Sequence, residues 1–137
     1  TNPGSPTQPL GKIASGGELS RVSLAIQVVT AQSDALSCMV FDEVDVGLGG
    51  AVAEVVGTLL RRLSERAQVL CVTHLPQVAA QGHDHLQVSK TSKSDSVQTA
   101  MERLDDEGKT REIARMLGGV KITEQSLAHA REMLAGV

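Results

Sequence analysis

Two adjacent carboxylates stand at the end of a short apolar run, where Cys38 to Phe41 is followed by Asp42 and Glu43. Four consecutive apolar residues are typical of a strand buried on both faces inside a parallel sheet. In such sheets the ligand crevice lies outside the carboxyl ends of the strands, and side chains alternate along a strand, so the two acids are expected to do different jobs. Asp42 is the candidate ligand of Mg²⁺, and Glu43 is the candidate base for an attacking water. A solvated acidic turn is the alternative interpretation.

A histidine stands in the corresponding place after a second apolar run. The apolar pattern from Val69 to Thr73 predicts another short strand, and His74 directly follows it. Because ligands gather at the carboxyl ends of parallel strands, His74 is expected beside the acid pair, where its imidazole can donate a hydrogen bond to a terminal phosphate. His83 and His85 lie nearby in the sequence, but two histidines without further ligands are weak evidence for a zinc site.

The sequence Ser15-Gly16-Gly17-Glu18 opens a predicted amphipathic helix that runs to about Ser33. Ser15 and Glu18 fit a capping box, which stabilises a helix by about 1 kcal/mol. The box does not explain the paired glycines, because glycine lowers helix stability relative to alanine. Close approach of a phosphate to the free N–H groups at the start of the helix would explain them.

The main phosphate-binding loop of nucleotide hydrolases is missing from this sequence. Gly11-Lys12 superficially suggests a Walker A loop, but Pro6 stands where the first glycine should be, and Ile13 stands where a hydroxyl should reach Mg²⁺. No other stretch of the chain fits the pattern.

The remaining patterns predict an α/β fold that positions these residues. Strand, helix and strand in succession predict a right-handed crossover between parallel strands. A glycine-rich loop at 44–50 precedes the crossover helix, and two strands joined by a polar turn predict a hairpin on the edge of the sheet. Residues 1–10, with three of the four prolines, predict an irregular lead-in. The predicted elements are helices over 51–66, 75–81, 110–117 and 123–134, and hairpin strands over 86–89 and 97–104.

Composition narrows the possible functions. The chain has 137 residues, of which 41% are hydrophobic, a net charge of -3, and Phe41 as its one aromatic residue. It therefore offers no aromatic platform for single-stranded nucleic acid and no general basic footprint for a polyanion. No apolar run reaches the length of a membrane span, and no signal-peptide pattern opens the sequence. Cys38 and Cys71 fall in apolar runs and are expected to be small core residues in a reducing, cytoplasmic compartment.

The order of these motifs resembles the C-terminal half of an ATP-binding-cassette (ABC) head of the structural-maintenance-of-chromosomes (SMC) type. Ser15 to Glu18 looks like the signature motif, Val40 to Glu43 like the Walker B motif, Asp45 to Gly49 like the D-loop, and His74 like the switch histidine. The amino-acid sequences of four segments are similar to those of the RecN family of bacterial DNA repair proteins. These segments are 14–21, 41–47, 72–79 and 128–134. The resemblance covers nearly the whole chain from Leu10 onward.

This resemblance implies a fold and a set of ligands. Residues 11–137 would form the parallel-sheet lobe of a P-loop NTPase head, with helices packed on the sheet and a small edge hairpin, and the Walker A lobe and coiled coil would lie outside this chain. Two such heads would sandwich ATP. Asp42 would help to hold Mg²⁺, Glu43 would act as the catalytic base, and His74 would contact the γ-phosphate bound to its own head.

The resemblance also implies partners. Ser15, Gly16, Gly17 and Glu18 would reach the nucleotide of the partner head, and Asp45 would belong to the nucleotide-binding D-loop. The expected partners are a second head in an ATP-dependent homodimer, the Walker A lobe of the same polypeptide, and DNA, with no membrane. The expected function is ATP hydrolysis in DNA double-strand-break repair and recombination, in the bacterial cytoplasm at the nucleoid. The isolated chain is expected to be inactive because it lacks Walker A.

Two departures from the pattern keep other hypotheses open. Ala14 occupies a position where many heads carry leucine, and Gly49 replaces the acid that commonly ends the D-loop, so communication between heads through that side chain is not expected. A degenerate lobe that acts only in head–head assembly is therefore the second hypothesis. The third is a stand-alone metal hydrolase built on Asp42, Glu43, His74, His83 and His85.

Overall fold

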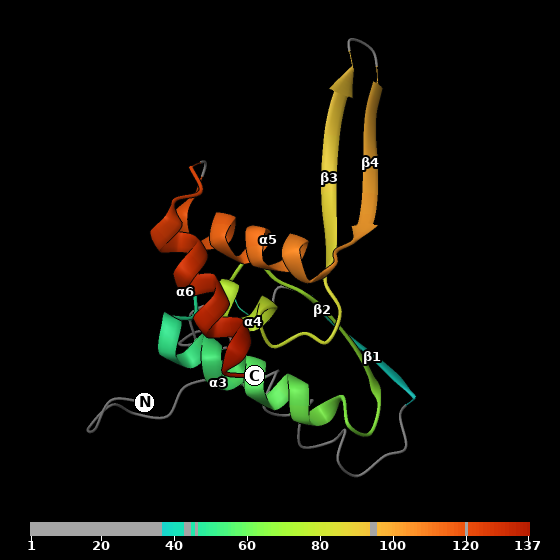
Figure 1. The fold of residues 1–137 in the computed structure, drawn as a ribbon. Coiled ribbons are helices and arrows are strands. Elements are labelled where there is room, and N and C mark those ends of the chain that lie inside the picture. The colour runs from blue at the N-terminus through green and yellow to red at the C-terminus, as the bar shows by residue number, and fades with distance from the viewer. Residues whose placement is uncertain (1–36, 43–44, 46, 94–95, 120) are drawn as a thin grey trace, which may run out of the picture.

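The computed structural model describes residues 37–42, 45, 47–93, 96–119 and 121–137. The predicted helix over 15–33, with the Ser-Gly-Gly-Glu sequence, and the candidate base Glu43 lie outside the described residues. Within them, mixed helices and strands follow one another along the chain (Figure 1). The elements are β1 (Cys38–Asp42), α3 (Gly50–Leu63), β2 (Gln68–Val72), α4 (Pro76–Ala79), β3 (Leu86–Lys93), β4 (Ser96–Arg103), α5 (Asp106–Gly118) and α6 (Glu124–Ala135).

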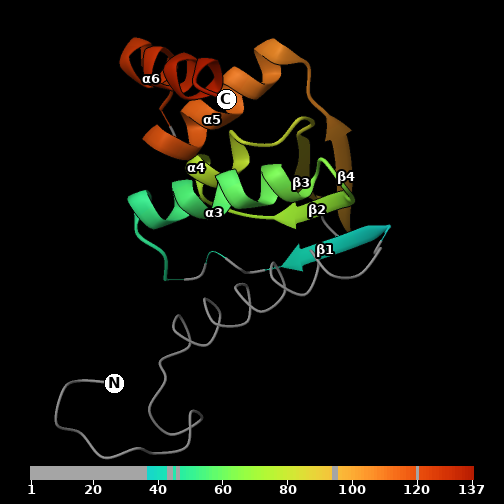
Figure 2. The same cartoon turned by 90° about the horizontal axis from the view of Figure 1, so that it is seen from below.

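The strands β1 and β2 pair in parallel, as the strand–helix–strand pattern predicts. Val40 lies opposite Leu70, and Asp42 lies opposite Val72. The connecting helix α3 lies along one side of this pair (Figure 2). Because both strands run in the same direction and in register, the loops that follow them leave the sheet at the same edge.

The strand pair is buried on one face only. Phe41, which is 2% exposed, points to the face that α3 covers. On the other face Val40 is 66% exposed and Val72 is 60% exposed. The prediction that this run is buried on both faces is therefore wrong for this chain, because no described element packs on the second face. The buried residues of this core are Phe41, Ala53, Val56, Leu60, Leu63 and Val78.

The short helix α4 connects this core to a second one. It begins with Pro76 in its first turn, as predicted, because proline needs no N–H partner there. Gly57 of α3 allows the close contact, since a Cβ at this position would lie 2.8 Å from Cγ of Gln81 and 3.0 Å from the carbonyl oxygen of Gln77. Val78 belongs to the first core and Ala80 to the second.

The helices α5 and α6 build the second core around Ile113, Ala114 and Ala130. Helix α5 begins four residues earlier than the apolar spacing predicts, because the Asp105 side chain accepts a hydrogen bond of 2.7 Å from the Gly108 N–H and caps the helix. It ends at Gly118, one residue beyond the predicted range of 110–117. The next residue, Gly119, has a φ of 73°, a conformation that glycine adopts without strain.

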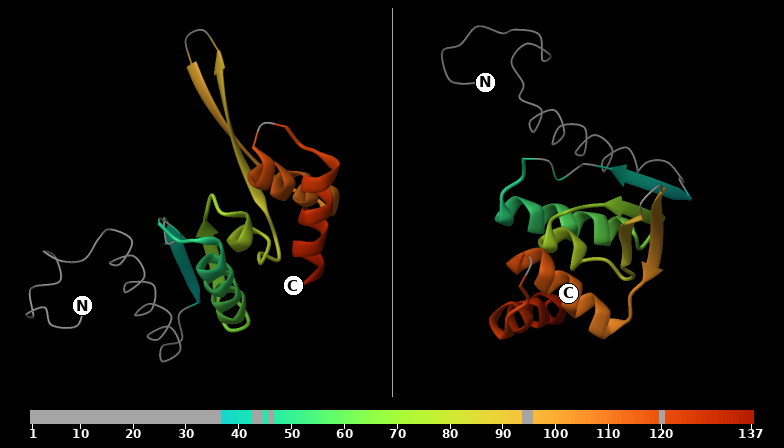
Figure 3. Two further views of the ribbon diagram at one scale, coloured as in Figure 1. Left: turned by 90° about the vertical axis from the view of Figure 1, so that its left-hand side faces the viewer. Right: turned by 90° about the horizontal axis from the view of Figure 1, so that it is seen from above.

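The predicted hairpin is present, but it is not on the edge of the parallel sheet. Strands β3 and β4 pair antiparallel and form a two-stranded sheet of their own. The hairpin projects from the helices (Figure 3), and its base is tied to α5. There the Gln87 side chain donates a hydrogen bond of 2.6 Å to Glu112. The described hairpin thus contacts helix α5 through this side-chain bond and pairs with neither β1 nor β2.

Glu112 provides a pH-dependent contribution to stability. Its buried carboxylate accepts hydrogen bonds of 2.8 and 2.6 Å from Arg115 as well as the bond from Gln87. The Arg115 hydrogen bonds hold the pKa of Glu112 below its ordinary range, and burial opposes them only in part. A carboxylate with a lowered pKa in the folded state stabilises the fold above about pH 4.3, and this stability is lost as the pH falls through the folded-state pKa.

We therefore expect Glu112→Gln to lower the free energy of unfolding by about 1 kcal/mol at pH 7, a modest value because Arg115 is half exposed and solvent weakens the pair. The difference between the variant and the wild type should narrow below about pH 4. Urea unfolding at a series of pH values measures it. A difference that stays constant from pH 7 to pH 3 would contradict this role for the carboxylate.

Candidate functional site

The carboxyl ends of β1 and β2 carry the polar groups that the sequence places there. Asp42 is the last residue of β1 and is exposed, and its partner Val72 is followed by Thr73 and His74. A second acid, Asp45, stands in the loop after β1. We call Asp42, Asp45, Thr73 and His74 the strand-end cluster. Within this cluster Asp45 and His74 are in contact. The motifs did not predict this pairing, because they placed His74 beside Asp42 and Glu43, and Glu43 lies outside the described residues.

Asp45 lies at the centre of this cluster and is almost fully buried, with 1% of the residue exposed. Its Oδ2 accepts a short hydrogen bond from the Thr73 hydroxyl and a second bond, of 3.2 Å, from the backbone N–H of His74. The Thr73 hydroxyl oxygen in turn accepts the N–H of Leu75 at 3.0 Å. Two loops that are distant in sequence are thereby joined through one carboxylate.

The His74 side chain is open to ligands. It is 71% exposed, and its Nδ1 lies 3.5 Å from Oδ2 of Asp45. One edge of the imidazole is thus held against the buried acid while the rest faces solvent. This is a suitable arrangement for contact with a phosphate that approaches the edge of the sheet.

The loop between β1 and α3 turns sharply after Asp45. The N–H of Leu48 donates to the carbonyl oxygen of Asp45 at 3.1 Å, and Gly47 within this turn has a φ of 73°. Only glycine adopts that backbone region without strain, so the turn requires it. Gly49 differs, because a Cβ there would meet nothing within 4 Å. The described surroundings of Gly49 would admit a side chain.

Sequence reasoning did not identify Thr73 as part of the site. The available signal was its position, since a hydroxyl residue stands directly between the last residue of a strand and the histidine. Threonine is common in strands for reasons of packing alone, so this signal does not reveal a partner. The partner is 28 residues away in the sequence, and only the fold brings it near.

The two cysteines have different environments. Cys71 packs against the core beside Phe41, but Cys38 is exposed on the open face, so the prediction that both are core residues is wrong for Cys38. Burial raises the pKa of the Cys71 thiol to about 11, and the carboxylates of Asp45 and Asp42 add to the rise. Because the thiolate is the reactive form, Cys71 should react slowly.

We expect the Cys71→Ser variant, which keeps Cys38, to react with a disulfide reagent at pH 8 at least about tenfold faster than the Cys38→Ser variant, which keeps Cys71. The rate of the Cys71 thiol should rise roughly tenfold per pH unit below pH 11, since its thiolate fraction does. Absorbance of the released thiolate measures both rates. Equal rates for the two variants at pH 8 would contradict the burial of Cys71.

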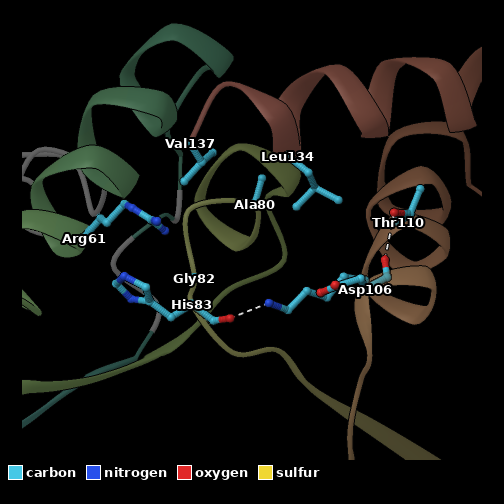
Figure 4. Close-up of a pocket in the computed structure, with 9 residues that line it drawn as sticks. Arg61, Ala80, Gly82, His83, Asp106, Thr110, Leu134 and Val137 are labelled. Atoms are coloured by element: carbon cyan, nitrogen blue, oxygen red, sulfur yellow. Dashed lines mark hydrogen bonds between the residues drawn. The ribbon is translucent and has the colours of Figure 1, made fainter.

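A separate cavity of about 360 Å³ lies between α3, α5 and α6 (Figure 4). Its cationic side chains already hold the loop after α4. Arg61 donates to the carbonyl oxygen of Gln81 at 2.6 Å, and the Lys109 ammonium donates to the carbonyl oxygen of His83. The cavity shares no residue with the strand-end cluster, which therefore remains the candidate functional site.

A metal site and a membrane-spanning helix are two further possibilities for the described part of the chain. There, no group of three histidine, cysteine, aspartate or glutamate side chains is arranged to hold a metal ion. This finding gives no support to a zinc site at His83 and His85 or to the metal-hydrolase hypothesis. In the same part of the chain, none of the helices combines the length and the apolar character needed to cross a membrane.

The chain is similar to curated proteins named DNA repair protein RecN. It is 59% identical to the protein of Vibrio cholerae over 134 residues, which make up 98% of this chain and 24% of that protein. For Bacillus subtilis the identity is 43%, again over 98% of this chain and 23% of the relative. The chain thus spans about a quarter of the length of these relatives and matches their C-terminal part, and the RecN resemblance inferred from its motifs is confirmed. No protein-family model matches the chain.

The fold is similar to a solved structure of an SMC ATPase. The TM-score is 0.62 at 19% sequence identity, over 86% of this chain and 70% of that one. At this low identity the likeness concerns the fold. It confirms the predicted fold class, an α/β fold similar to that of an SMC ATPase, with a parallel strand pair and a hairpin.

Proposed function

We propose that this RecN-like chain is the C-terminal lobe of an ATP-binding and ATP-hydrolysing head, in a protein of bacterial DNA double-strand-break repair and recombination. The observation that carries the proposal is the strand-end cluster, in which Asp42 ends one strand and the exposed His74 comes two residues after the neighbouring parallel strand. The open apolar face with Val40 and Val72 supports a lobe that needs a further layer. We assign that layer to the Walker A lobe of the same polypeptide.

The residues of this edge suit hydrolysis of a phosphoanhydride. Asp42, an exposed carboxylate at the end of a strand, would hold Mg²⁺ that accompanies ATP. Glu43, the next residue, would orient and deprotonate the attacking water. His74 would contact the γ-phosphate. Bound Mg²⁺ would neutralise charge on the phosphates, and the remaining catalysis would come from positioning.

The signature motif would act on a second head. Ser15, Gly16, Gly17 and Glu18 would reach the γ-phosphate of the partner's ATP through backbone N–H groups. The structural relative is described in terms of ATP-driven dimerization and DNA-stimulated activation, which supports a homodimer and a DNA partner here. RecN relatives act in bacterial DNA repair by name, which supports a cytoplasmic, nucleoid-associated location. The isolated chain would bind ATP poorly and turn over negligibly, because it has no Walker A loop.

Pairing of the heads tests the proposal. In the intact polypeptide, Ser15→Arg should abolish ATP-induced dimerization, because a long cation would occupy the position of the partner's γ-phosphate. Ser5→Arg, the same change in the lead-in, is the matched control and should leave dimerization intact. Light scattering after size exclusion, with and without ATP, measures it. If the Ser15→Arg protein still dimerizes with ATP, ATP is not held between two heads in the proposed way. If the wild-type protein dimerizes without ATP and does not hydrolyse it, a degenerate lobe that acts only in assembly is favoured.

A further inference from the structure

We infer that Asp45 is the positioning residue for His74: it sets the position of the histidine loop instead of touching nucleotide itself. The inference rests on the proposed function, because His74 has a task there only if it contacts the γ-phosphate. Asp45 belongs to the D-loop segment by sequence, which suggested a nucleotide-binding role. Its burial, with 1% exposed, directs its carboxylate into its own chain instead.

The contacts of Asp45 all lead to one short segment, the loop at 73–75 between β2 and α4. The carboxylate accepts the side-chain hydroxyl of Thr73 and the backbone N–H of His74, and Nδ1 of His74 lies 3.5 Å away. The same hydroxyl oxygen accepts the N–H of Leu75. Leu75 is the N-cap residue of α4 and has no side-chain cap of its own. Asp45 therefore holds both the backbone and the side chain of the histidine loop.

The chemistry of the group favours a carboxylate at this position. A buried polar group is costly unless its hydrogen bonds are made, and an ionised carboxylate only accepts them. Thr73 and His74 supply two donors from adjacent residues. An asparagine would keep one acceptor oxygen but would bring an amide with two donors of its own into the buried site. The described contacts of Asp45 are all made by Oδ2, which an amide oxygen could replace, but the negative charge beside Nδ1 of His74 would be lost while the volume of the side chain stayed the same.

Asp45 lies close in sequence to the candidate metal ligand, so its hydrogen bonds to the histidine loop bear on the proposed ATP hydrolysis. Asp45 stands three residues after Asp42 and two after Glu43, and the turn at Gly47 constrains the backbone beyond it. Asp45, close after the end of β1, is thus hydrogen-bonded to the loop with the histidine. Under the proposed function, this link would hold His74 in a fixed position relative to Asp42.

Steady-state ATP hydrolysis by the intact protein tests this role. We expect Asp45→Asn to lower kcat roughly tenfold while KM for ATP changes less than about threefold, because Asp45 touches no nucleotide. Thr73→Val, which removes the hydroxyl at constant shape, should lower kcat in the same way. Thr73→Ser, which keeps the hydroxyl, should stay within about twofold of the wild type.

A double-mutant cycle separates positioning from general damage. If Asp45 acts through His74, Asp45→Asn should lower kcat no further in a His74→Ala background. Losses that multiply in the double variant, or an Asp45→Asn protein with wild-type kcat, would overturn the inference. If the Asp45 variants fold poorly, the two Thr73 variants still test the inference. Equal kcat values for Thr73→Val and Thr73→Ser would overturn the positioning role of Asp45. A wild-type protein without ATP hydrolysis would instead contradict the proposed function.

Discussion

Replacing Glu43 by glutamine in the intact protein is expected to slow ATP hydrolysis by on the order of 10²-fold or more while ATP still binds. Glutamine keeps the size of the side chain and one carbonyl oxygen, but it cannot accept a proton from water at neutral pH. Asp42 would still hold Mg²⁺, and the signature motif would still reach the partner's phosphate. Binding and dimerization should therefore persist, and only the chemical step should fail.

Phosphate release and nucleotide binding, measured on the same preparation, check this expectation. Glu65→Gln is the matched control, because Glu65 is an exposed glutamate just beyond α3 and distant in sequence from the motifs. Its kcat should equal that of the wild type. Hydrolysis by the Glu43→Gln protein at an unchanged rate would remove Glu43 from the role of base, and loss of ATP binding would indicate a structural role instead.

Replacing Phe41 by alanine is expected to destabilise the fold by about 3–5 kcal/mol. Phe41 is the one aromatic residue of the chain, is 2% exposed and packs among the residues of the first core. Truncation removes most of its buried area and leaves a cavity between the strands and α3. Domains are stable by only about 5–15 kcal/mol in total, so this change should remove a large share of the stability.

Urea unfolding followed by circular dichroism measures the loss. Val40→Ala is the matched control, because Val40 is the neighbouring strand residue but is 66% exposed on the open face. It should cost less than about 1 kcal/mol. Similar midpoints for the two variants would contradict the assignment of the core to the α3 side of the strand pair. In the intact protein, the cost of Val40→Ala should rise if a further layer covers that face.

Elements whose signals are local can be predicted from the amino-acid sequence alone. The apolar stripe of α3, the proline at the start of α4 and the glycine that follows α5 each depend on a few neighbouring residues. The parallel pairing of β1 and β2 also follows, since a helix between two short apolar runs favours a crossover. The start of α5 was missed because its capped, acidic first turn has no apolar period.

Which faces are covered and which distant groups meet depends on how the elements pack. A run of apolar residues predicts burial but cannot say that Phe41 is covered while Val40 stays open, because that depends on where α3 packs. The hairpin pattern likewise does not predict that its base binds α5 through Glu112.

The strand-end cluster shows the same division. The motifs indicated Asp42 and His74, since each follows an apolar run directly. The bonds from Thr73 and His74 to Asp45 span 28 and 29 residues of sequence. Local patterns encode the conformation of short segments, whereas such contacts form only when packing brings separate segments together, which is why the fold alone reveals the anchor of the histidine loop.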